Sequence, residues 1–517
     1  MSLRLIKHFF AITGGQLLNL VSQILLAPLF LRHWSVPIYG AWMVLSGLTT
    51  YLGTLDLGMN SAVGNRLLAS YVRKDHAEYQ RCQHSAMAFY LVLALGATIV
   101  VGAAFWLLPV QSWAGVKRSI VPDAPWILWL LALQVLWMMP VGLLGNFYTT
   151  VGDPARSKWI NNWRSAGVLV VTVLGLMLGC GMKTLAVLQL LPMIPVALYV
   201  LWDIYRRYPG YLPSVAHADK SVVREILKPS LMFAVIALAF SLTQQGTLLI
   251  TSSIFGLTAA AILVPARTLT SLALQSFRII STTAWPDMTM LYARKELGRL
   301  RLLNQLVVTS SVTLCIAIAA ALWSEGVEVM NVWLHHKIRV DPLFLRLLLV
   351  YVVLETPWIA NSTVTAAVNR HHNQAWSYLV SGIIALGSML LLSPRLGMNA
   401  VPVALILGEA VACYHFVIKD TCKVLEQAYL PYMSRLWFGV LFVGTLALGS
   451  GWLVHQIAWG PALMRWSEVG SVTLVASCLG ARLVWIGDEE WSLLRQKAEM
   501  VLLRLRPRRL SASAIVK

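Results

Sequence analysis

The chain has 517 residues, of which 58% are hydrophobic and only 12% are charged; this is about half the charged fraction of ordinary soluble domains, which excludes a soluble globular protein. The formal net charge is +19, but the cationic residues fall between long apolar stretches, where membrane topology alone places them, so we expect no nucleic-acid partner. The six cysteines are scattered and form no CxxC pair, so the sequence predicts no metal site, no disulfide framework and no cofactor.

Apolar stretches follow one another through the whole chain, and about 20 apolar residues are enough to cross a bilayer as a helix. The sequence therefore predicts an all-α, polytopic transmembrane protein with about 14 membrane-spanning helices. The expected spans are 9–31, 38–62, 86–108, 125–150, 163–181, 184–205, 229–252, 257–285, 303–323, 343–368, 375–393, 397–418, 436–455 and 468–487.

The first span follows Arg4 and Lys7 and is long enough to cross the membrane. We therefore expect it to be the first helix and not a cleaved leader. Lys and Arg are about three times as frequent in the alternate connections that share a side with the N-terminus as in the others, which is typical of cytoplasmic loops. The sequence thus predicts that both termini lie in the cytoplasm.

Short identities recur between the two halves of the chain, which indicates an internal repeat of six helices in the same orientation. The clearest are Tyr71, Arg73 and Lys74, which recur as Tyr292, Arg294 and Lys295. Two parallel lobes predict a substrate path between them and alternating access by rocking.

The repeat and the composition divide the chain into four expected parts. They are an N-lobe over 1–217, a C-lobe over 218–425, two extra helices over 426–487 and a tail over 488–517. Apolar and basic residues alternate in the tail at helical spacing, which predicts a basic amphipathic helix on the anionic inner leaflet. The alternative is an ordinary solvated positive segment.

Polar residues inside a membrane are costly, so they are the first candidates for function. Arg267, Ser271 and Arg278 share one face of the span 257–285, and Gln275 lies near that face. Eleven residues separate the two arginines, which places them roughly 16 Å apart along the helix axis. Two guanidinium groups on one wall suit an anionic headgroup; the alternative is a structural pairing, or a side chain that reaches the interface.

Other polar side chains are spread over several spans. Neutral amides can line a wet cavity of the size of a sugar, although interhelical hydrogen bonding is the alternative explanation. These further candidates for substrate binding are Gln16, Asn19, Gln23, Asn60, Gln244 and Arg66. Asp56 and Glu355 are candidates for neutralising an arginine or binding a coupling proton, with structural pairing as the alternative.

Catalysis is not expected from this sequence. No P-loop is present, so the sequence does not indicate an ATP-driven pump. The segments predicted to lie outside are short, the longest being 109–124 and 324–342, which leaves little room for the domain of a polymerase or ligase. A transporter or channel is the expected class.

Several short motifs carry a family resemblance. They are Pro37-Ile-Tyr-Gly-Ala-Trp42, Leu55-Asp-Leu-Gly-Met-Asn60, Gly152-Asp-Pro154, Trp285-Pro-Asp-Met288 and Ala293-Arg-Lys295. With the helix layout, they resemble the polysaccharide-transport branch of the multidrug/oligosaccharidyl-lipid/polysaccharide exporter (MOP) superfamily, the Wzx-like lipid-linked oligosaccharide flippases.

The resemblance implies two six-helix lobes around a cationic cavity, two extra helices, and a place in a bacterial inner membrane. The implied substrate is an undecaprenyl-pyrophosphate-linked oligosaccharide, with membrane lipids and a polysaccharide polymerase or other synthesis proteins as partners. A drug/cation antiporter, a lipid II flippase and a non-transporting scaffold are the alternatives. The first span carries no arginine on its polar face, which weakens the similarity to the lipid II flippases.

Overall fold

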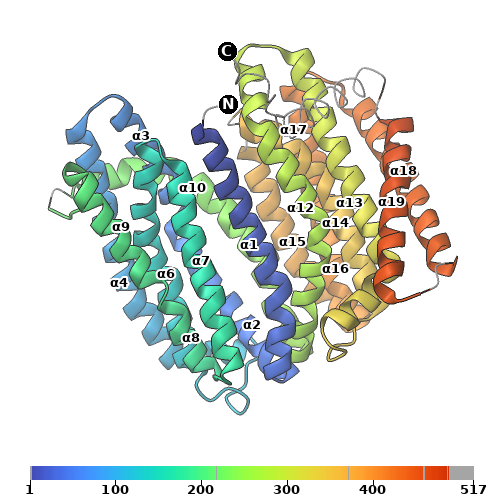
Figure 1. Ribbon diagram of the computed structural model, residues 1–517, viewed down its shortest axis with the longest axis horizontal. Coiled ribbons are helices and arrows are strands. Elements are labelled where there is room, and N and C mark those ends of the chain that lie inside the picture. Colours follow the sequence, from blue (N-terminus) through green and yellow to red (C-terminus); the bar gives the residue numbers. More distant parts are fainter. Residues whose placement is uncertain are drawn as a thin grey trace, which may run out of the picture. The chain divides into compact units, whose positions relative to one another are not determined.

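The computed structural model describes residues 3–216, 218–368, 370, 372–457, 460–485 and 487, and every regular element in these ranges is helical (Figure 1). The α-helices are α1 Leu3–His33, α2 Val36–Thr50, α3 Met59–Val72, α4 His76–Leu107, α5 Val110–Trp113, α6 Ala124–Thr150, α7 Pro154–Met177, α8 Met182–Leu190, α9 Met193–Arg207, α10 Lys220–Ser241, α11 Thr247–Phe255, α12 Leu257–Ala293, α13 Leu297–Trp333, α14 Pro342–Ala367, α15 His372–Leu396, α16 Ala400–Ala412, α17 Tyr414–Val424, α18 Tyr429–Ile457 and α19 Ala462–Val484. Shorter 3₁₀ and π segments are η1 Tyr51–Asp56, η2 Pro209–Tyr211, η3 Leu242–Gly246 and η4 Gly397–Asn399. The predicted all-α fold is confirmed. The expected tail 488–517 lies outside the described residues.

Twelve segments of the described chain are long and apolar enough to cross a membrane. The expected spans 375–393 and 397–418 are joined in one of these segments, His372–Val424. Within it, η4 separates α15 from α16, which pack against each other. The protein is therefore a multi-pass membrane protein, and the apolar stretches of the sequence correspond to its helices.

The expected span 38–62 is not among the twelve segments, because the structure breaks it into α2, η1 and α3. Leu57 and Gly58 adopt left-handed backbone angles, with φ of 50° and 69°. Two consecutive left-handed residues end a right-handed helix. The break falls in the middle of the motif Leu55–Asn60, which explains why a glycine is needed there.

Contacts between residues divide the chain into two compact units. Unit 1 contains the described residues within 1–269, 327–351 and 372–413, and unit 2 contains those within 270–326, 352–371 and 414–487. The long helices α12, α13 and α14 contribute residues to both units. The division into an N-lobe over 1–217 and a C-lobe over 218–425 stays a prediction.

Each unit has its own apolar core. In unit 1, side chains of α3, α4, α6, α9 and α10 form a cluster that includes the fully buried Met59, Tyr79 and Phe147. In unit 2, a cluster that includes Met288, Leu300 and Val364 joins α12, α13 and α14. These cores fix the helices that carry the polar side chains described below.

The same turn ends two helices that the sequence repeat pairs. Lys74 after α3 and Lys295 after α12 both have left-handed φ, 58° and 59°. Their backbone N–H groups donate to Tyr71 O and Tyr292 O, each at 3.0 Å. Helix ends of this kind satisfy the last carbonyl groups. The matched pairs of the repeat therefore share one local geometry.

Gly40 in α2 lies against the beginning of α12. A Cβ atom on Gly40 would lie 2.0 Å from the backbone oxygen of Leu257. Since a backbone oxygen cannot move aside as a flexible side chain can, we expect Gly40→Ala to destabilise the protein by about 1–3 kcal/mol or more. Thermal unfolding of the purified protein in detergent would measure this loss. Gly387→Ala in α15 is the control, because nothing lies within 4 Å of its Cβ position; equal unfolding temperatures for the two variants would contradict the prediction.

Candidate functional site

A polar pocket of about 390 Å³ lies between α1 and α7. Its volume is within the range of ordinary ligand sites, about 300–1,000 Å³. Besides a glycine, it is lined by Ala11, Ile12, Gln16, Leu18, Asn19 and Ser22 from α1 and by Lys158, Asn161, Asn162 and Ser165 from α7. Two of the three amides predicted on the first span, Gln16 and Asn19, thus line one pocket, and Gln23 does not.

Close packing of α1 on α7 holds this pocket in shape (Figure 1). Asn162 Nδ2 donates a hydrogen bond of 2.8 Å to the backbone oxygen of Ala11. A Cβ atom on Gly15 would lie 2.5 Å from Asn162 Oδ1. Small residues allow this approach between membrane helices, and interhelical hydrogen bonds then secure it.

Lys158 gives the α1–α7 pocket a positive charge. It lies in the second turn of α7 and its side chain is exposed. Among the described residues, no hydrogen bond or ion pair involves its ammonium group. Three N–H donors of Lys158 are therefore available to a ligand. No carboxylate is among the described residues that line the pocket.

A second, smaller pocket of about 180 Å³ shares Lys158 and Asn161 and extends toward α6 and α9. It is also lined by Arg164, which donates to Asn161 Oδ1 at 3.3 Å. The Nε of Arg164 is buried and has no hydrogen-bond partner in the described structure. An unsatisfied buried donor of this kind is costly. Two cations and several amides therefore converge on the N-terminal half of α7, a combination that suits an anionic, hydroxyl-rich ligand.

Arg267 in α12 is engaged with the helix that precedes it. Its guanidinium donates to the backbone oxygen of Gln244 at 2.8 Å and to Thr247 Oγ1 at 2.5 Å. Gln244 belongs to η3, a π-helical segment between α10 and α11. Such segments interrupt the regular hydrogen-bond ladder and are frequent at functional sites. Two separately predicted candidates thus meet in the structure, but through the side chain of Arg267 and the backbone oxygen of Gln244.

The remaining candidates on α12 lie in unit 2. Arg278 is exposed, while Ser271 and Gln275 are half-buried. Among the described residues, no ion pair involves Arg278. The predicted common wall of Arg267 and Arg278 stays a prediction, because the two residues belong to different units.

Asn60 and Asp56 hold neighbouring elements together. Asn146 Nδ2 donates to the backbone oxygen of Asn60 at 2.9 Å and to its side-chain oxygen at 2.5 Å. Tyr90 donates to Asp56 Oδ1 at 2.5 Å. Asp56 is the last residue of η1 and lies directly before the break at Leu57. These contacts favour the structural alternative for both residues.

Glu355 lies on α14 and is 5% exposed. It has polar interactions in this buried position. Burial of an acid in a membrane helix agrees with a role in charge balance or proton coupling, and that role stays a prediction.

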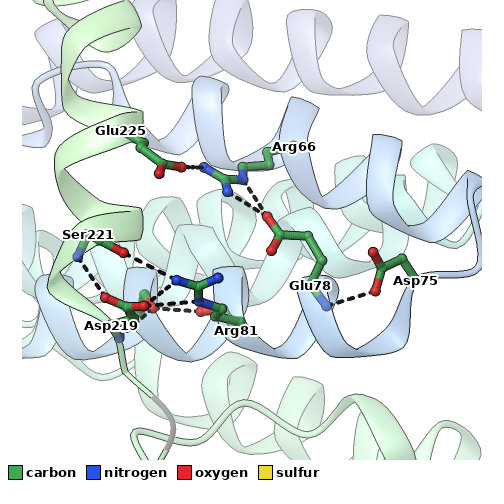
Figure 2. Close-up of polar contacts among 8 residues, drawn as sticks. Arg66, Asp75, Glu78, Arg81, Asp219, Ser221 and Glu225 are labelled. Carbon is green, nitrogen blue, oxygen red and sulfur yellow. Dashed lines mark hydrogen bonds and ion pairs between the residues drawn. The ribbon is translucent and has the colours of Figure 1, made fainter.

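Arg66, in the middle of α3, lies in an ion-pair network (Figure 2). Its guanidinium contacts Glu78 at 2.5 Å and Glu225 at 3.0 Å. Burial alone lowers the pKa of Arg66, but hydrogen bonds to Glu78 and Glu225 more than offset this and raise the pKa above its ordinary value. This candidate for substrate binding is therefore already paired with carboxylates in the structure.

A second pair beside it fixes the segment that connects α9 to α10. Arg81 in α4 pairs with Asp219, and its guanidinium also donates to Ser221 Oγ at 3.2 Å (Figure 2). Hydrogen bonds from Arg81 and Ser221 lower the pKa of Asp219 to about 2. A carboxyl with a lowered pKa stays ionised until the pH falls toward that value. The connection predicted to link the lobes is thus tied to α4 throughout the physiological pH range.

Sequence reasoning missed Lys158, Asn161 and Arg164. The expected span begins at residue 163, whereas α7 begins at Pro154. The first turns of α7 therefore fall in an expected loop. Their signal was present, because Lys158, Asn161 and Ser165 follow helical spacing of three and four residues.

The described structure resembles solved membrane transporters. The inward-closed lipid II flippase MurJ is 10% identical, with a TM-score of 0.70 over 92% of this chain and 98% of that chain. An inward-facing multidrug resistance MATE family transporter of the MOP superfamily is 15% identical, with a TM-score of 0.69 over 80% of this chain and 94% of that chain. An outward-facing MATE family transporter is 16% identical, with a TM-score of 0.60 over 82% of this chain and 96% of that chain.

No protein-family model matches the chain, and no curated protein matches its sequence. At identities of 10–16%, the likeness establishes the fold. The chain therefore has the fold that MATE transporters and MurJ share. The resemblance of the sequence to the MOP superfamily agrees with this fold, and the Wzx-like branch remains a proposal.

Proposed function

We propose that this protein is a flippase that moves an undecaprenyl-pyrophosphate-linked oligosaccharide across a bacterial inner membrane for surface or exopolysaccharide synthesis. Both termini lie in the cytoplasm, and two lobes alternate in exposing the substrate to each side. The observation that carries the proposal is the α1–α7 pocket, which places Lys158 beside amide side chains within membrane helices.

The chemistry of the α1–α7 pocket suits each part of such a substrate. Sugar hydroxyls are expensive to place in hydrocarbon without hydrogen-bond partners. Gln16, Asn19 and Asn161 each offer amide donors and an acceptor. Lys158 offers a positive charge to a phosphate. The polyprenyl chain needs no pocket, since it stays in the lipid.

The extent of the structural matches also supports a lipid-linked substrate. The match to MurJ covers 92% of this chain, whereas the MATE matches quoted above cover 80% and 82%. The difference is about a tenth of the chain. MurJ is a lipid II flippase, so the more extensive match is to a protein that translocates a lipid.

A drug/cation antiporter of the same fold is the main competitor. A cationic drug favours a carboxylate in its binding site. The described lining of the α1–α7 pocket has a lysine and no carboxylate. Asp56 is also hydrogen-bonded to Tyr90, so it is a weaker candidate for cation binding. These observations favour an anionic substrate.

Arg267 and η3 offer a means of coupling the substrate to lobe movement. The guanidinium bonds to Gln244 O and Thr247 Oγ1 at an interruption of the helix ladder. Interruptions of this kind provide a place where a helix can bend. An anionic substrate that attracts Arg267 would compete with these two bonds and change the bend.

Complementation tests the proposal. The chain is expressed in bacterial strains that each lack one flippase for a lipid-linked sugar. We expect surface polymer to return in one polysaccharide strain and the lipid-linked intermediate on the cytoplasmic face to fall. Rescue only of a strain lacking its lipid II flippase would replace the proposed substrate by lipid II. Resistance to lipophilic cations without any rescue would identify an antiporter instead.

A further inference from the structure

A pocket of about 430 Å³ lies in unit 2, among the ends of α13, α17, α18 and α19, and shares no lining residue with the α1–α7 pocket of unit 1. It is lined by Arg301, Gln305, Val308, Thr309, Glu426, Gln427, Ala428, Pro431, Tyr432, Arg435, Leu436 and Trp485. We refer to it as the α13–α18–α19 pocket. The ends that form it are all predicted to face the cytoplasm, so it is placed at the level of the inner-leaflet headgroups.

Backbone carbonyl groups hold the two arginines of this pocket. Arg301 donates to Leu425 O at 2.6 Å and to Glu426 O at 2.9 Å. Arg435 donates to Trp485 O at 3.1 Å, and Gln305 donates to the same oxygen at 3.1 Å. These bonds satisfy carbonyl groups at the ends of α17 and α19. The guanidinium groups are thereby oriented before any ligand arrives.

Each arginine keeps donors for a ligand. A guanidinium has five N–H donors, and the bonds above use two from Arg301 and one from Arg435. Glu426 also lines the pocket, so the described lining carries two positive charges and one negative charge. A single phosphate monoanion would neutralise the net positive charge of this lining.

Besides the two arginines, the α13–α18–α19 pocket is lined by an aromatic side chain, Trp485. Trp485 is 2% exposed, and its indole Nε1 donates to Arg435 O at 3.1 Å. A Cβ atom on Gly439 would lie 2.0 Å from the indole ring, so α18 leaves space for this side chain. Trp485 follows the last residue of α19, and tryptophan is enriched where membrane helices end at the membrane–water interface.

Large apolar side chains are exposed beside the pocket. Leu430 and Phe438 on α18 are 77% and 61% exposed, and Leu483 on α19 is 75% exposed. In a membrane protein such side chains contact acyl chains. A free phosphate would make no contact with these apolar side chains. A phospholipid would contact them with its acyl chains while its headgroup occupies the pocket.

We propose that the α13–α18–α19 pocket binds the phosphate of an anionic phospholipid of the inner leaflet, with Arg301 and Arg435 as the recognising cations. Basic pockets between membrane helices on the cytoplasmic side bind such headgroups in other proteins. A bound lipid would link α18 and α19 to α13 and stabilise the folded state by mass action. This inference is independent of the substrate that the protein transports.

Native mass spectrometry of the purified full chain tests the proposal, with phosphatidylglycerol and phosphatidylcholine as probes. We expect the wild type to retain phosphatidylglycerol at least about fivefold better than phosphatidylcholine. Arg435→Gln should abolish most of this preference, because it removes one of the two cations and leaves the described lining, with Arg301 and Glu426, without net charge. Gln305 still donates to Trp485 O in this variant, so the end of α19 stays capped.

The control is Arg294→Gln combined with Arg299→Gln. Both residues are exposed at the connection between α12 and α13, which is predicted to face the cytoplasm, and they lie outside the pocket. These substitutions should leave the lipid preference unchanged, and a loss equal to that of Arg435→Gln would overturn the proposal as a general charge effect. Equal retention of the two lipids by the wild type would also overturn it.

Two further experiments distinguish an anionic phospholipid from other possible occupants of the pocket. Thermal stabilisation of the wild type by millimolar inorganic phosphate, without lipid, would assign the pocket to a soluble anion and overturn the lipid proposal. A chain ending at residue 487 tests the tail as occupant. If only this shortened chain binds phosphatidylglycerol, the tail fills the pocket and the proposal is wrong; equal binding by both chains supports it.

Discussion

Replacing Lys158 by methionine is expected to slow translocation of a lipid-linked oligosaccharide by about ten- to a hundredfold. Lys158 is the cation in the described lining of the α1–α7 pocket, and that lining contains no carboxylate. A hydrogen bond to a charged group contributes about 1.5–3 kcal/mol, and each 1.4 kcal/mol corresponds to a factor of about ten. Methionine keeps much of the side-chain length and removes the charge. The measurement is the rate at which labelled substrate becomes accessible outside proteoliposomes.

Two further variants make the Lys158 result specific. Lys158→Arg keeps a cation and should retain most of the rate. Lys419→Met removes an exposed lysine from α17 in unit 2 and should change little. All variants must show the wild-type unfolding temperature. An unchanged rate in Lys158→Met would remove this lysine from the substrate site, and an equal loss in Lys419→Met would attribute the effect to overall charge.

Neutral substitutions in the same pocket separate sugar from phosphate recognition. Gln16→Leu and Asn19→Leu remove amides of α1 without changing the charge. We expect a substrate with a long glycan to lose more than a polyprenyl diphosphate with one sugar, because only the glycan presents several hydroxyl groups. Lys158→Met should affect both substrates equally, since both carry the diphosphate.

The helices of this protein were predictable because lipid imposes a simple rule. A helix must be apolar over about 20 residues to cross a bilayer, and this constraint is visible in a single sequence. The constraint is weakest where a span is broken. Leu57 and Gly58 interrupt the second span. Hydropathy averaged over a stretch of sequence does not reveal that two residues adopt left-handed backbone angles.

The candidate site was only partly predictable, for two physical reasons. Polar residues were identified where they interrupt an apolar run, as with Gln16 and Asn19. They were missed where they precede one, as with Lys158 in the first turns of α7. The second reason is that ion-pair partners could not be identified, because contacts such as that of Arg66 with Glu225 join residues far apart in the chain. A single sequence does not reveal such contacts.

Replacing Glu325 by alanine is expected to destabilise the protein by about 3–5 kcal/mol, as removal of one partner does in other buried ion pairs. The side chain of Glu325 on α13 is 3% exposed. His455 Nδ1 on α18 lies 2.5 Å from its Oε1, and Arg465 Nε on α19 donates to its Oε2 at 3.1 Å. One carboxylate thus joins the last two described helices to α13. Thermal unfolding in detergent, followed by size-exclusion chromatography, would measure the loss.

The size of this effect follows from what the substitution leaves behind. Arg465, whose side chain is 22% exposed in the wild type, would lose this carboxylate, and a largely buried cation is costly when its ion-pair partner is removed. Glu325→Gln keeps an acceptor and should cost less. Glu325→Leu combined with Arg465→Leu removes both charges and should recover much of the stability, because replacing both partners by apolar side chains is often nearly neutral.

A surface ion pair near the beginning of the same helix provides the control. Glu296 pairs with Arg299 at 2.8 Å, but the arginine side chain is 77% exposed. Such pairs contribute about 0–1 kcal/mol, so Glu296→Ala should lower the unfolding temperature little. If Glu325→Ala and Glu296→Ala cost the same, the buried carboxylate does not anchor α18 and α19.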